Sequence, residues 1–197
     1  MYGNNPYGQA GWPNAANRGM GGPPPSIFGA LPYYTPPTRA NTLIFQFTSF
    51  NPDVMNCTVL GPKAQPYYRI VTDAPTPGFT VFQNGTGKNF AFIEWRSHPQ
   101  VEIRGAVHKQ RAGDLLPLSA SRSLRRMQIG ERQYEWIPNE QYISLCTAGS
   151  GAREVLARIS RSQTCVNLEM TSQAISLGLL DIAVVVTVLL QSGRSID

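Results

Sequence analysis

The sequence predicts a mainly β fold, an antiparallel sandwich or barrel whose chain ends in one buried apolar helix. Three observations lead to this prediction. From Thr42 onward apolar residues recur with a period of two, and short β-rich runs follow one another with turn residues between them. A 17-residue apolar run then stands near the C-terminus. Strands spaced about 8–12 residues apart fit hairpin connections, which pair neighbouring strands antiparallel.

The strands are expected from alternation and from turn residues. LIFQF at 43–47, YYRIV at 67–71 and the run Val101–Val107 each place apolar side chains on one face. In the segment 79–95, Asn84-Gly85 and Gly87 separate two β-rich runs, which predicts a hairpin because Asn and Gly tolerate positive φ. The later candidate strands are Arg126–Ile129, Arg132–Trp136, Ile143–Thr147, Val155–Ile159 and Val166–Met170.

The apolar run Ala174–Leu190 is expected to form a helix over about residues 172–192. Its five consecutive β-branched residues would also suit a strand, but its length exceeds that of a normal strand. Ser172 can serve as the N-cap and Gly193 as the C-terminal stop. A membrane span needs roughly 20 apolar residues and tolerates a central Asp poorly, so we expect burial in protein instead. Asp181 should then pair with an inward-pointing Arg or with a hydroxyl of the barrel wall.

Composition divides the chain into a tail, residues 1–40, and a domain, residues 41–197. The tail contains seven Gly and eight Pro and lacks apolar periodicity, so we expect it to be disordered. No targeting signal is recognisable at the N-terminus, which predicts an intracellular, cytoplasmic protein. Three separated cysteines without CxxC spacing indicate reduced thiols rather than disulfides or a metal site, and no cofactor is expected.

Several features of the C-terminal half form one recognisable set. They are Tyr134-Glu135-Trp136, the small-residue turn Gly149–Gly151, the strand Val155–Ile159, Leu168, and the Leu-Asp-Ile-x-Val-Val helix from Leu180 to Val185. This set resembles a fungal family of uncharacterised domains that looks like a branch of the tubby-like superfamily, with the LURP-one-related proteins and the phospholipid scramblases. Over roughly residues 41–193 the resemblance implies a closed antiparallel barrel of about twelve strands around a central C-terminal helix.

The resemblance also implies a range of functions. Tubby-type relatives bind phosphoinositide head groups through basic side chains, and scramblases are associated with phospholipid movement. This sequence lacks an acidic calcium-ligand run of the scramblase type and a cysteine cluster suited to multiple palmitoylation. Lipid scrambling is therefore not expected of it.

The net charge of +5 is concentrated in residues 104–132, which hold seven cations and two carboxylates. Clustered cations attract phosphate on lipid head groups or nucleic acid, although a solvated loop is the plainer interpretation. Aromatic residues do not interleave with the cations, so nucleic acid is not expected as a partner. The candidate residues for binding anionic lipid are Arg104, Lys109, Arg111, Arg122, Arg125 and Arg126.

Catalytic and metal sites find little support. Gly85-Thr86-Gly87-Lys88 ends like a phosphate-binding loop but lacks the remaining motif residues, and strands flank it where a helix should follow, so a hairpin turn is expected. His98 and His108 stand in no recognisable motif and are expected at the surface. No catalytic or metal-ligating residue is predicted.

The tail contains one short pattern with a known mechanism. Leu31, Pro32 and Tyr34 form a Leu-Pro-x-Tyr sequence like that of WW-domain ligands, and nearby prolines favour the extended conformation that such domains bind. A flexible spacer is the plainer alternative. The leading hypothesis is thus a non-enzymatic module that binds an anionic phospholipid surface peripherally, without a transmembrane segment. A protein-interaction adaptor acting through the tail is second, and an enzyme is third.

Overall fold

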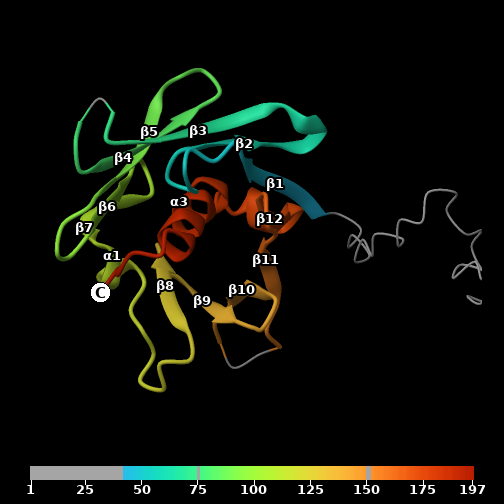
Figure 1. Ribbon diagram of the computed structural model, residues 1–197. Helices are drawn as coiled ribbons and strands as arrows, with labels where there is room; N and C mark the ends of the chain where they lie inside the picture. The colour runs from blue at the N-terminus through green and yellow to red at the C-terminus, as the bar shows by residue number, and fades with distance from the viewer. Residues whose placement is uncertain (1–41, 75, 150–151) are drawn as a thin grey trace, which may run out of the picture. The chain divides into compact units, whose positions relative to one another are not determined.

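The computed structural model describes residues 42–74, 76–149 and 152–197, which form a nearly closed barrel of antiparallel strands (Figure 1). The strands are β1 (Thr42–Thr48), β2 (Cys57–Leu60), β3 (Pro66–Thr72), β4 (Phe79–Asn84), β5 (Asn89–Glu94), β6 (Gln100–Ile103), β7 (Val107–Arg111), β8 (Arg125–Ile129), β9 (Arg132–Pro138), β10 (Tyr142–Thr147), β11 (Val155–Arg161) and β12 (Val166–Thr171). Their order in the single sheet is β7-β6-β5-β4-β3-β2-β1-β12-β11-β10-β9-β8. The predicted mainly β barrel is confirmed, whereas the tail 1–40 lies outside the described residues.

The period of two in the sequence corresponds to the two faces of the barrel wall. In β1, Phe45 and Phe47 are buried, whereas Ile44 between the strand start and Phe45 is 41% exposed. Residues on one face of a strand point toward the same side of the sheet, so the apolar set fills the interior. The strands expected in the segments 126–170 all form, within one or two residues of their predicted ends.

The expected hairpin in the segment 79–95 is confirmed as β4 and β5. Asn84 closes its turn, because its side-chain oxygen accepts hydrogen bonds from the backbone N–H groups of Thr86 and Lys88, at 3.1 and 3.0 Å. Gly87 has a φ of +77°, which a residue with a side chain rarely adopts. The sequence Gly85-Thr86-Gly87-Lys88 is therefore a hairpin turn, as predicted.

One strand prediction is corrected, and one strand was not predicted. Val101–Val107 was expected to be one strand, but it divides into β6 and β7 around a turn in which Gly105 has a φ of +76°. The period of two in this segment continues across the turn, so the apolar pattern alone does not show where the first strand ends. The short strand β2 was not predicted, because its four residues follow a segment rich in Asn and Pro that gives no periodic signal.

The single helix expected over about 172–192 is wrong, because the segment forms two helices, α2 (Ser172–Ser176) and α3 (Leu180–Gln191). Gly178, with a φ of +72°, turns the chain between them. Thr171, not Ser172, caps α2, since its side chain accepts a hydrogen bond from the Ala174 N–H at 3.1 Å. Gly193 follows α3 with a φ of +71°, as expected for a C-terminal stop.

Helix α3 lies inside the ring of strands (Figure 1), and every residue from Ile182 to Leu189 is buried. The hydroxyl of Thr187 is accommodated there because it donates to the Ala183 carbonyl at 2.7 Å. The prediction of an apolar helix buried in protein is thus confirmed for this part of the run. Among the described residues, no helix is both long and apolar enough to cross a bilayer.

The barrel has one seam, between the edge strands β7 and β8. The connection between them crosses it with α1 (Ala112–Leu115), and Leu118 forms a bridge to Arg125 of β8. Ile196 is also buried, and its carbonyl oxygen lies 3.3 Å from the place a side chain on Gly113 would occupy. The chain's last residues therefore cover the seam together with α1.

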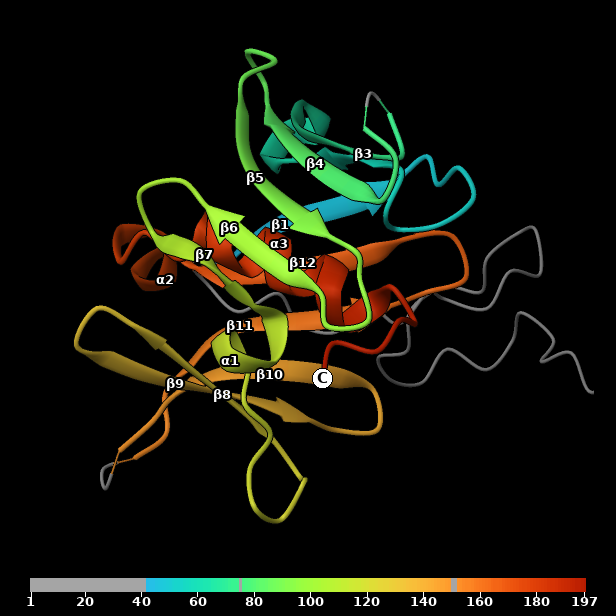
Figure 2. The ribbon, with the colours of Figure 1, turned by 90° about the vertical axis from the view of Figure 1, so that its left-hand side faces the viewer.

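The connections alternate between the two ends of the barrel, because each strand runs antiparallel to the one before it. The β2–β3, β4–β5, β6–β7, β8–β9 and β10–β11 connections lie at the end where β12 leads into α2, which we call the α2 end. Figure 2 shows α2 on the same side as the β6–β7 and β8–β9 turns. The remaining connections and residues 192–197 lie at the other end, which we call the C-terminal end.

Candidate functional site

Arg125, one of the six predicted lipid-binding residues, is part of the fold. Its guanidinium donates to the Leu116 carbonyl at 2.8 Å and to both carboxylate oxygens of Asp197, at 2.8 and 2.6 Å. These hydrogen bonds hold the pKa of Asp197 below its ordinary value. Only 17% of the Arg125 side chain is exposed, so this residue ties the last residue to β8 and has little surface for a ligand.

Two further predicted residues contact carboxylates. Lys109 of β7 donates to Glu94 at 2.8 Å, and Arg96 also pairs with this glutamate. The hydrogen bond from Lys109 and the nearby Arg96 together lower the pKa of Glu94, against the opposing effect of burial. Arg126 of β8 lies 4.0 Å from Glu135, which Arg153 also contacts at 3.0 Å.

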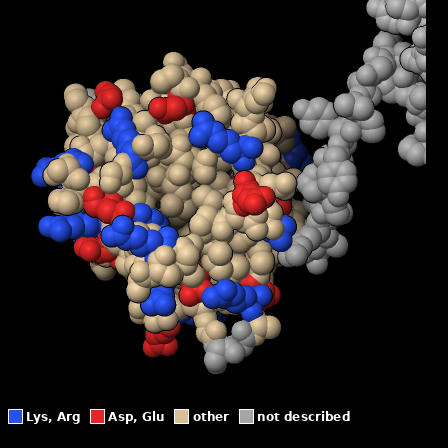
Figure 3. Space-filling view, turned by 60° about the horizontal axis from the view of Figure 1, so that its bottom comes forward, with Lys and Arg blue, Asp and Glu red and all other residues tan. Residues whose placement is uncertain are grey.

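Arg104, Arg111 and Arg122 are exposed and, within the described residues, form no ion pair. They do not lie together. Arg104 occupies the β6–β7 turn at the α2 end, whereas Arg111 ends β7 and Arg122 lies in the β7–β8 connection, both at the C-terminal end. The basic stretch 104–132 is therefore divided between two ends and a seam. On the face drawn in Figure 3, Lys and Arg are interspersed with Asp and Glu.

A different set of cations gathers at the α2 end. The connections there carry four basic residues, each in a different turn, and two carboxylates, Glu131 and Glu154. A fifth cation, Arg132, is the first residue of β9 at the same end. The connections of the C-terminal end, including residues 192–197, carry three basic residues and five carboxylates. The four basic residues in the α2-end connections are Lys63, Lys88, Arg104 and Arg153.

Exposed apolar side chains lie at the α2 end as well. Leu43, Ile44 and Tyr67, near the starts of β1 and β3, are 38%, 41% and 45% exposed. The Tyr67 ring is held in place by an edge contact with Phe45, at a centroid distance of 5.4 Å. It also lies over Gly61, where a Cβ would come within 2.6 Å of the ring, so only glycine leaves room for it. A groove of about 520 Å³ beside these residues includes Leu43, Ile44 and Lys63 in its lining.

Near the α2 end, a hydrogen bond joins the barrel wall to α3 in the interior. Tyr68 of β3 donates its hydroxyl to the Asp181 carboxylate of α3 at 2.6 Å. Burial raises the pKa of Tyr68 above its ordinary range, and the hydrogen bond and charge of Asp181 raise it further. The expected pairing of Asp181 with a hydroxyl of the wall is thus confirmed.

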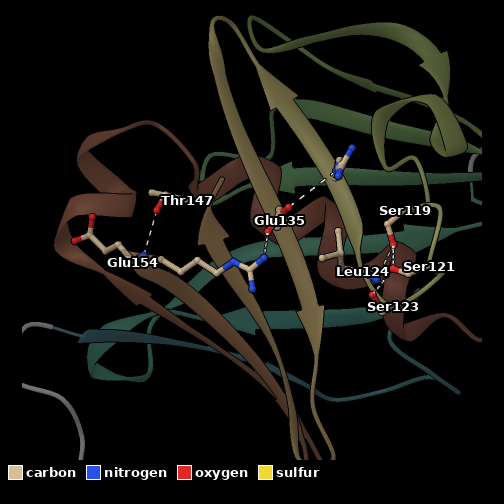
Figure 4. A network of polar contacts seen from close by, with 9 residues as sticks. Ser119, Ser121, Ser123, Leu124, Glu135, Thr147 and Glu154 are labelled. Atoms are coloured by element: carbon tan, nitrogen blue, oxygen red, sulfur yellow. Dashed lines mark hydrogen bonds and ion pairs between the residues drawn. The ribbon is translucent and has the colours of Figure 1, made fainter. Parts of the chain in front are cut away.

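A polar cleft of about 680 Å³ follows the seam, with lining residues from β7, α1, β8 and β9. Its charged groups are Asp114, Arg126 and Glu135. Figure 4 shows Glu135 on β9 as the acceptor of two ion pairs, which occupy its carboxylate. Cys146 lies on the neighbouring strand, opposite Glu135 in register. Burial raises the pKa of this thiol, so the group next to the cleft is a protonated structural cysteine at neutral pH.

The remaining candidate residues are placed as follows. His98 and His108 are exposed, as predicted. Burial, with a smaller effect of Asp53, raises the pKa of the Cys57 thiol to about 12, so this cysteine is packed as an apolar group. Within residues 42–74, 76–149 and 152–197 no cluster of His, Cys, Asp and Glu is arranged to hold a metal ion. The WW-ligand sequence Leu31, Pro32 and Tyr34 lies outside the described residues.

Sequence reasoning missed Lys63, Lys88 and Leu43 as parts of one surface. They are dispersed along the chain, and each is unremarkable within its own turn or strand. What identifies them is that they all lie at the same end of the barrel, because the connections alternate between the two ends. Every second turn of an antiparallel sheet lies at the same end, and in this chain four of the five turns at the α2 end carry a cation.

Comparison with known proteins gives a family and no function. Residues 52–195 match the model of a family of unknown function, DUF6593, and the chain therefore belongs to this family. No curated protein matches it. The solved structures include an X-ray structure of an Arabidopsis thaliana protein with a TM-score of 0.38 and 10% sequence identity, covering 74% of this chain and 91% of that one. A similarity of this degree does not bear on function.

Proposed function

We propose that this DUF6593 protein is a non-enzymatic module that binds anionic phospholipid surfaces peripherally through the α2 end of its barrel. One observation carries the proposal: exposed cations that have no carboxylate partner among the described residues lie in alternate turns, at the same end as three exposed apolar side chains. Cations near an anionic surface contribute about 1 kcal/mol each, and apolar side chains add affinity by entering the interface. The resemblance to tubby-like proteins, which bind phosphoinositide head groups through basic side chains, supports the same assignment.

The choice of the α2 end follows from which charges are available. Lys63, Lys88 and Arg104 are exposed and have no carboxylate partner among the described residues, so binding a phosphate would break no existing ion pair. At the C-terminal end, by contrast, Arg125 and Arg96 already contact carboxylates. A phosphate at either of these two guanidinium groups would have to compete with a carboxylate that is fixed to the same domain. A phosphate at the unpaired Arg111 or Arg122 would meet an end whose connections carry more carboxylates than cations.

Co-sedimentation with vesicles tests the proposal. Binding to phosphatidylcholine vesicles that contain phosphatidylinositol 4,5-bisphosphate or phosphatidylserine should exceed binding to phosphatidylcholine alone and should weaken as salt rises. The triple variant Lys63→Ala, Lys88→Ala, Arg104→Ala should lose affinity on the order of 100-fold, since three cations are removed at about 1 kcal/mol each.

A matched control has the same change in net charge at the other end. Arg111→Ala, Arg122→Ala, Arg161→Ala removes three exposed cations of the C-terminal end and should change binding little. Ile44→Ser, which keeps every charge, should weaken binding to anionic vesicles through the lost apolar contact. Equal losses in the two triple variants, or equal binding to neutral and anionic vesicles, would contradict the proposal.

A second candidate function is an adaptor that acts through the tail. Its support is the sequence Leu31-Pro32-Tyr33-Tyr34, which matches the Leu-Pro-x-Tyr form of WW-domain ligands. Tyr34→Ala should then abolish capture of the chain by an immobilised WW domain, while leaving vesicle binding unchanged. If the WW domain captured Tyr34→Ala as well as the native chain, the adaptor hypothesis would be wrong.

A further inference from the structure

Strand β8 borders the seam, and only the first part of its free edge is paired. In the connection from β7, Ser119 donates its N–H to the Leu124 carbonyl at 2.9 Å. Arg126 donates its own N–H to the Pro117 carbonyl, also at 2.9 Å, so the two segments run antiparallel. Pro117 has no N–H and cannot return a hydrogen bond to the Arg126 carbonyl. The pairing therefore ends at Arg126, the second residue of β8.

Beyond this point the backbone of Gln128 faces the seam. In an antiparallel strand the N–H and C=O of one residue point to the same side, and alternate residues point to opposite sides. Arg126 points to the seam, so Gln128, two positions further on, does so as well. Gln133 lies opposite Gln128 in β9, and its carbonyl accepts from the Ala148 N–H on the far side, at 3.0 Å. Within the described residues, the N–H and C=O of Gln128 are therefore left without a partner.

The cleft along the seam gives access to this edge. Figure 2 shows α1 crossing between β7 and β8. The cleft of about 680 Å³ has Pro117 and Gln128 in its lining, with Asp114 of α1 on the opposite wall. Gln128 is exposed, and its side-chain amide donates to the Gly130 carbonyl at 3.1 Å, so the side chain lies along its own strand. Free N–H and C=O groups on a strand edge are where an extended peptide can add a further strand.

Arg126 determines which side chain such a peptide should carry. Its side chain is 68% exposed and lies 4.0 Å from Glu135. Arg153 contacts the same glutamate at 3.0 Å, so Arg126 can turn to another carboxylate while Glu135 remains paired. Arg126 and Gln128 are both on the outer face of β8, whereas Met127 between them is buried. A peptide side chain opposite Gln128 would share this face and lie diagonal to Arg126, within reach of a glutamate.

We propose that the seam binds an extended peptide segment of a partner protein, antiparallel to β8, with a glutamate opposite Gln128. The peptide backbone continues the pairing that Pro117 ends. The glutamate N–H donates to the Gln128 carbonyl, and the glutamate carbonyl accepts the Gln128 N–H. Its carboxylate pairs with Arg126, and β-branched residues on both sides of it favour the extended conformation. This inference does not depend on lipid binding at the α2 end.

Titration of the full chain with the capped peptide Ser-Thr-Val-Glu-Val-Thr-Ser tests the proposal. In proton–nitrogen correlation spectra the Gln128 amide signal should shift saturably, and its hydrogen exchange should slow because the N–H becomes bonded. The same peptide methylated at the glutamate nitrogen keeps every side chain but cannot donate to the Gln128 carbonyl. It should bind about tenfold more weakly. Glutamine in place of the peptide glutamate should weaken binding about threefold, as expected for an exposed ion pair.

Variants of the protein test the same contacts from the other side. Arg126→Gln should weaken binding about threefold and remove the difference between the glutamate and glutamine peptides. Its matched control, Arg161→Gln, removes an exposed cation of β11 outside the cleft lining and should leave the affinity unchanged. Gln128→Pro removes the N–H at an edge position, where proline is tolerated, and should abolish binding. Gln128→Ala keeps the N–H and should bind like the native chain.

Three outcomes would overturn the proposal. The first is equal binding of the methylated and unmethylated peptides, and the second is a Gln128 amide that no peptide protects from exchange. The third is protection of this amide in the free chain. Protection that depends on protein concentration would assign the edge to a second copy of the chain, and protection that does not would assign it to another segment of the same chain.

Discussion

The two ends of the barrel use the same kinds of side chain in opposite ways. At the C-terminal end, Arg125 binds Asp197, Arg96 binds Glu94, and Arg194 lies over the Trp95 ring, so these guanidinium groups hold the chain's last residues and the wall together. At the α2 end, Lys63, Lys88 and Arg104 have no such partners among the described residues. The paired arginines of the C-terminal end therefore contribute to stability, whereas these three cations of the α2 end remain available to a ligand.

Both ends depend on α3, which runs between them inside the barrel, and a charge placed in α3 should have the largest effect of all. Val185 is fully buried at the middle of this helix. Val185→Asp would bury a carboxylate without a partner at a cost of more than about 5 kcal/mol, comparable with the whole stability of a domain. We expect an unfolded protein, seen as loss of the cooperative thermal transition by circular dichroism.

Val185→Ala is the control for this substitution. It removes apolar volume without adding charge and should lower the free energy of unfolding by about 2 kcal/mol while leaving a folded protein. If Val185→Asp retained the thermal transition of the native protein, α3 would not be the core element that connects the two ends.

Breaking the contacts of Arg125 should cause the next largest loss, at the C-terminal end alone. Arg125→Ala leaves the carbonyl of the buried Leu116 without its charged donor, which we expect to cost about 2 kcal/mol. Asp197→Asn, which weakens only the half-exposed ion pair, should cost less than about 1 kcal/mol because solvent screens it. Urea unfolding of both variants measures the two costs. Equal losses would assign the stabilisation to the ion pair and not to the carbonyl.

How far the sequence predicts this fold depends on where the turn residues lie. The run at 43–47 and the five candidate strands within 126–170 contain no glycine and correspond to strands, and Gly130, Asn139 and Gly149 lie between strands. Gly105 and Gly178 show where the pattern fails: each turns the chain by a positive φ inside a run whose apolar spacing continues unbroken. Glycine is compatible with both structures, and tertiary packing decides between them.

The candidate site was less predictable than the fold, for a geometric reason. Arg104, Lys109 and Arg122 are close in sequence. Strand β7, however, runs from one end of the barrel to the other between Arg104 and Arg122, so these two arginines lie at opposite ends. Lys63 and Arg104 are 41 positions apart, yet two turns of equal parity place them at the same end. Charge density along a β chain therefore predicts a surface only after the strand order is known.

Within the α2 end, the contact between Tyr68 and Asp181 should contribute an intermediate amount. Tyr68→Phe removes the hydroxyl that donates to the Asp181 carboxylate and should lower the free energy of unfolding by about 1–2 kcal/mol, since the group is only partly shielded from water. Chemical denaturation at pH 7 measures this loss. A change below about 0.3 kcal/mol would mean that water replaces the hydroxyl without cost.

The same pair predicts a pH dependence with a definite sign. The pKa of Tyr68 is raised in the folded protein above its ordinary value of 10.0, so the folded state retains a proton that the unfolded state loses. This stabilisation is complete below pH 10 and is lost as the pH rises above it. The native protein should therefore lose more stability than Tyr68→Phe between about pH 10 and 12.

The smallest effect on stability is expected for the three exposed cations of the α2 end. Lys63→Ala, Lys88→Ala, Arg104→Ala should change the free energy of unfolding by no more than about 0.5 kcal/mol in total, because exposed side chains without partners contribute little to stability. Removing three like charges from a chain of net charge +5 also relieves repulsion, which favours a small gain. The measurement is the urea midpoint beside that of Arg125→Ala. A loss as large as that of Arg125→Ala would show that these cations hold the barrel together, and the α2 end would then have no free charge to offer a ligand.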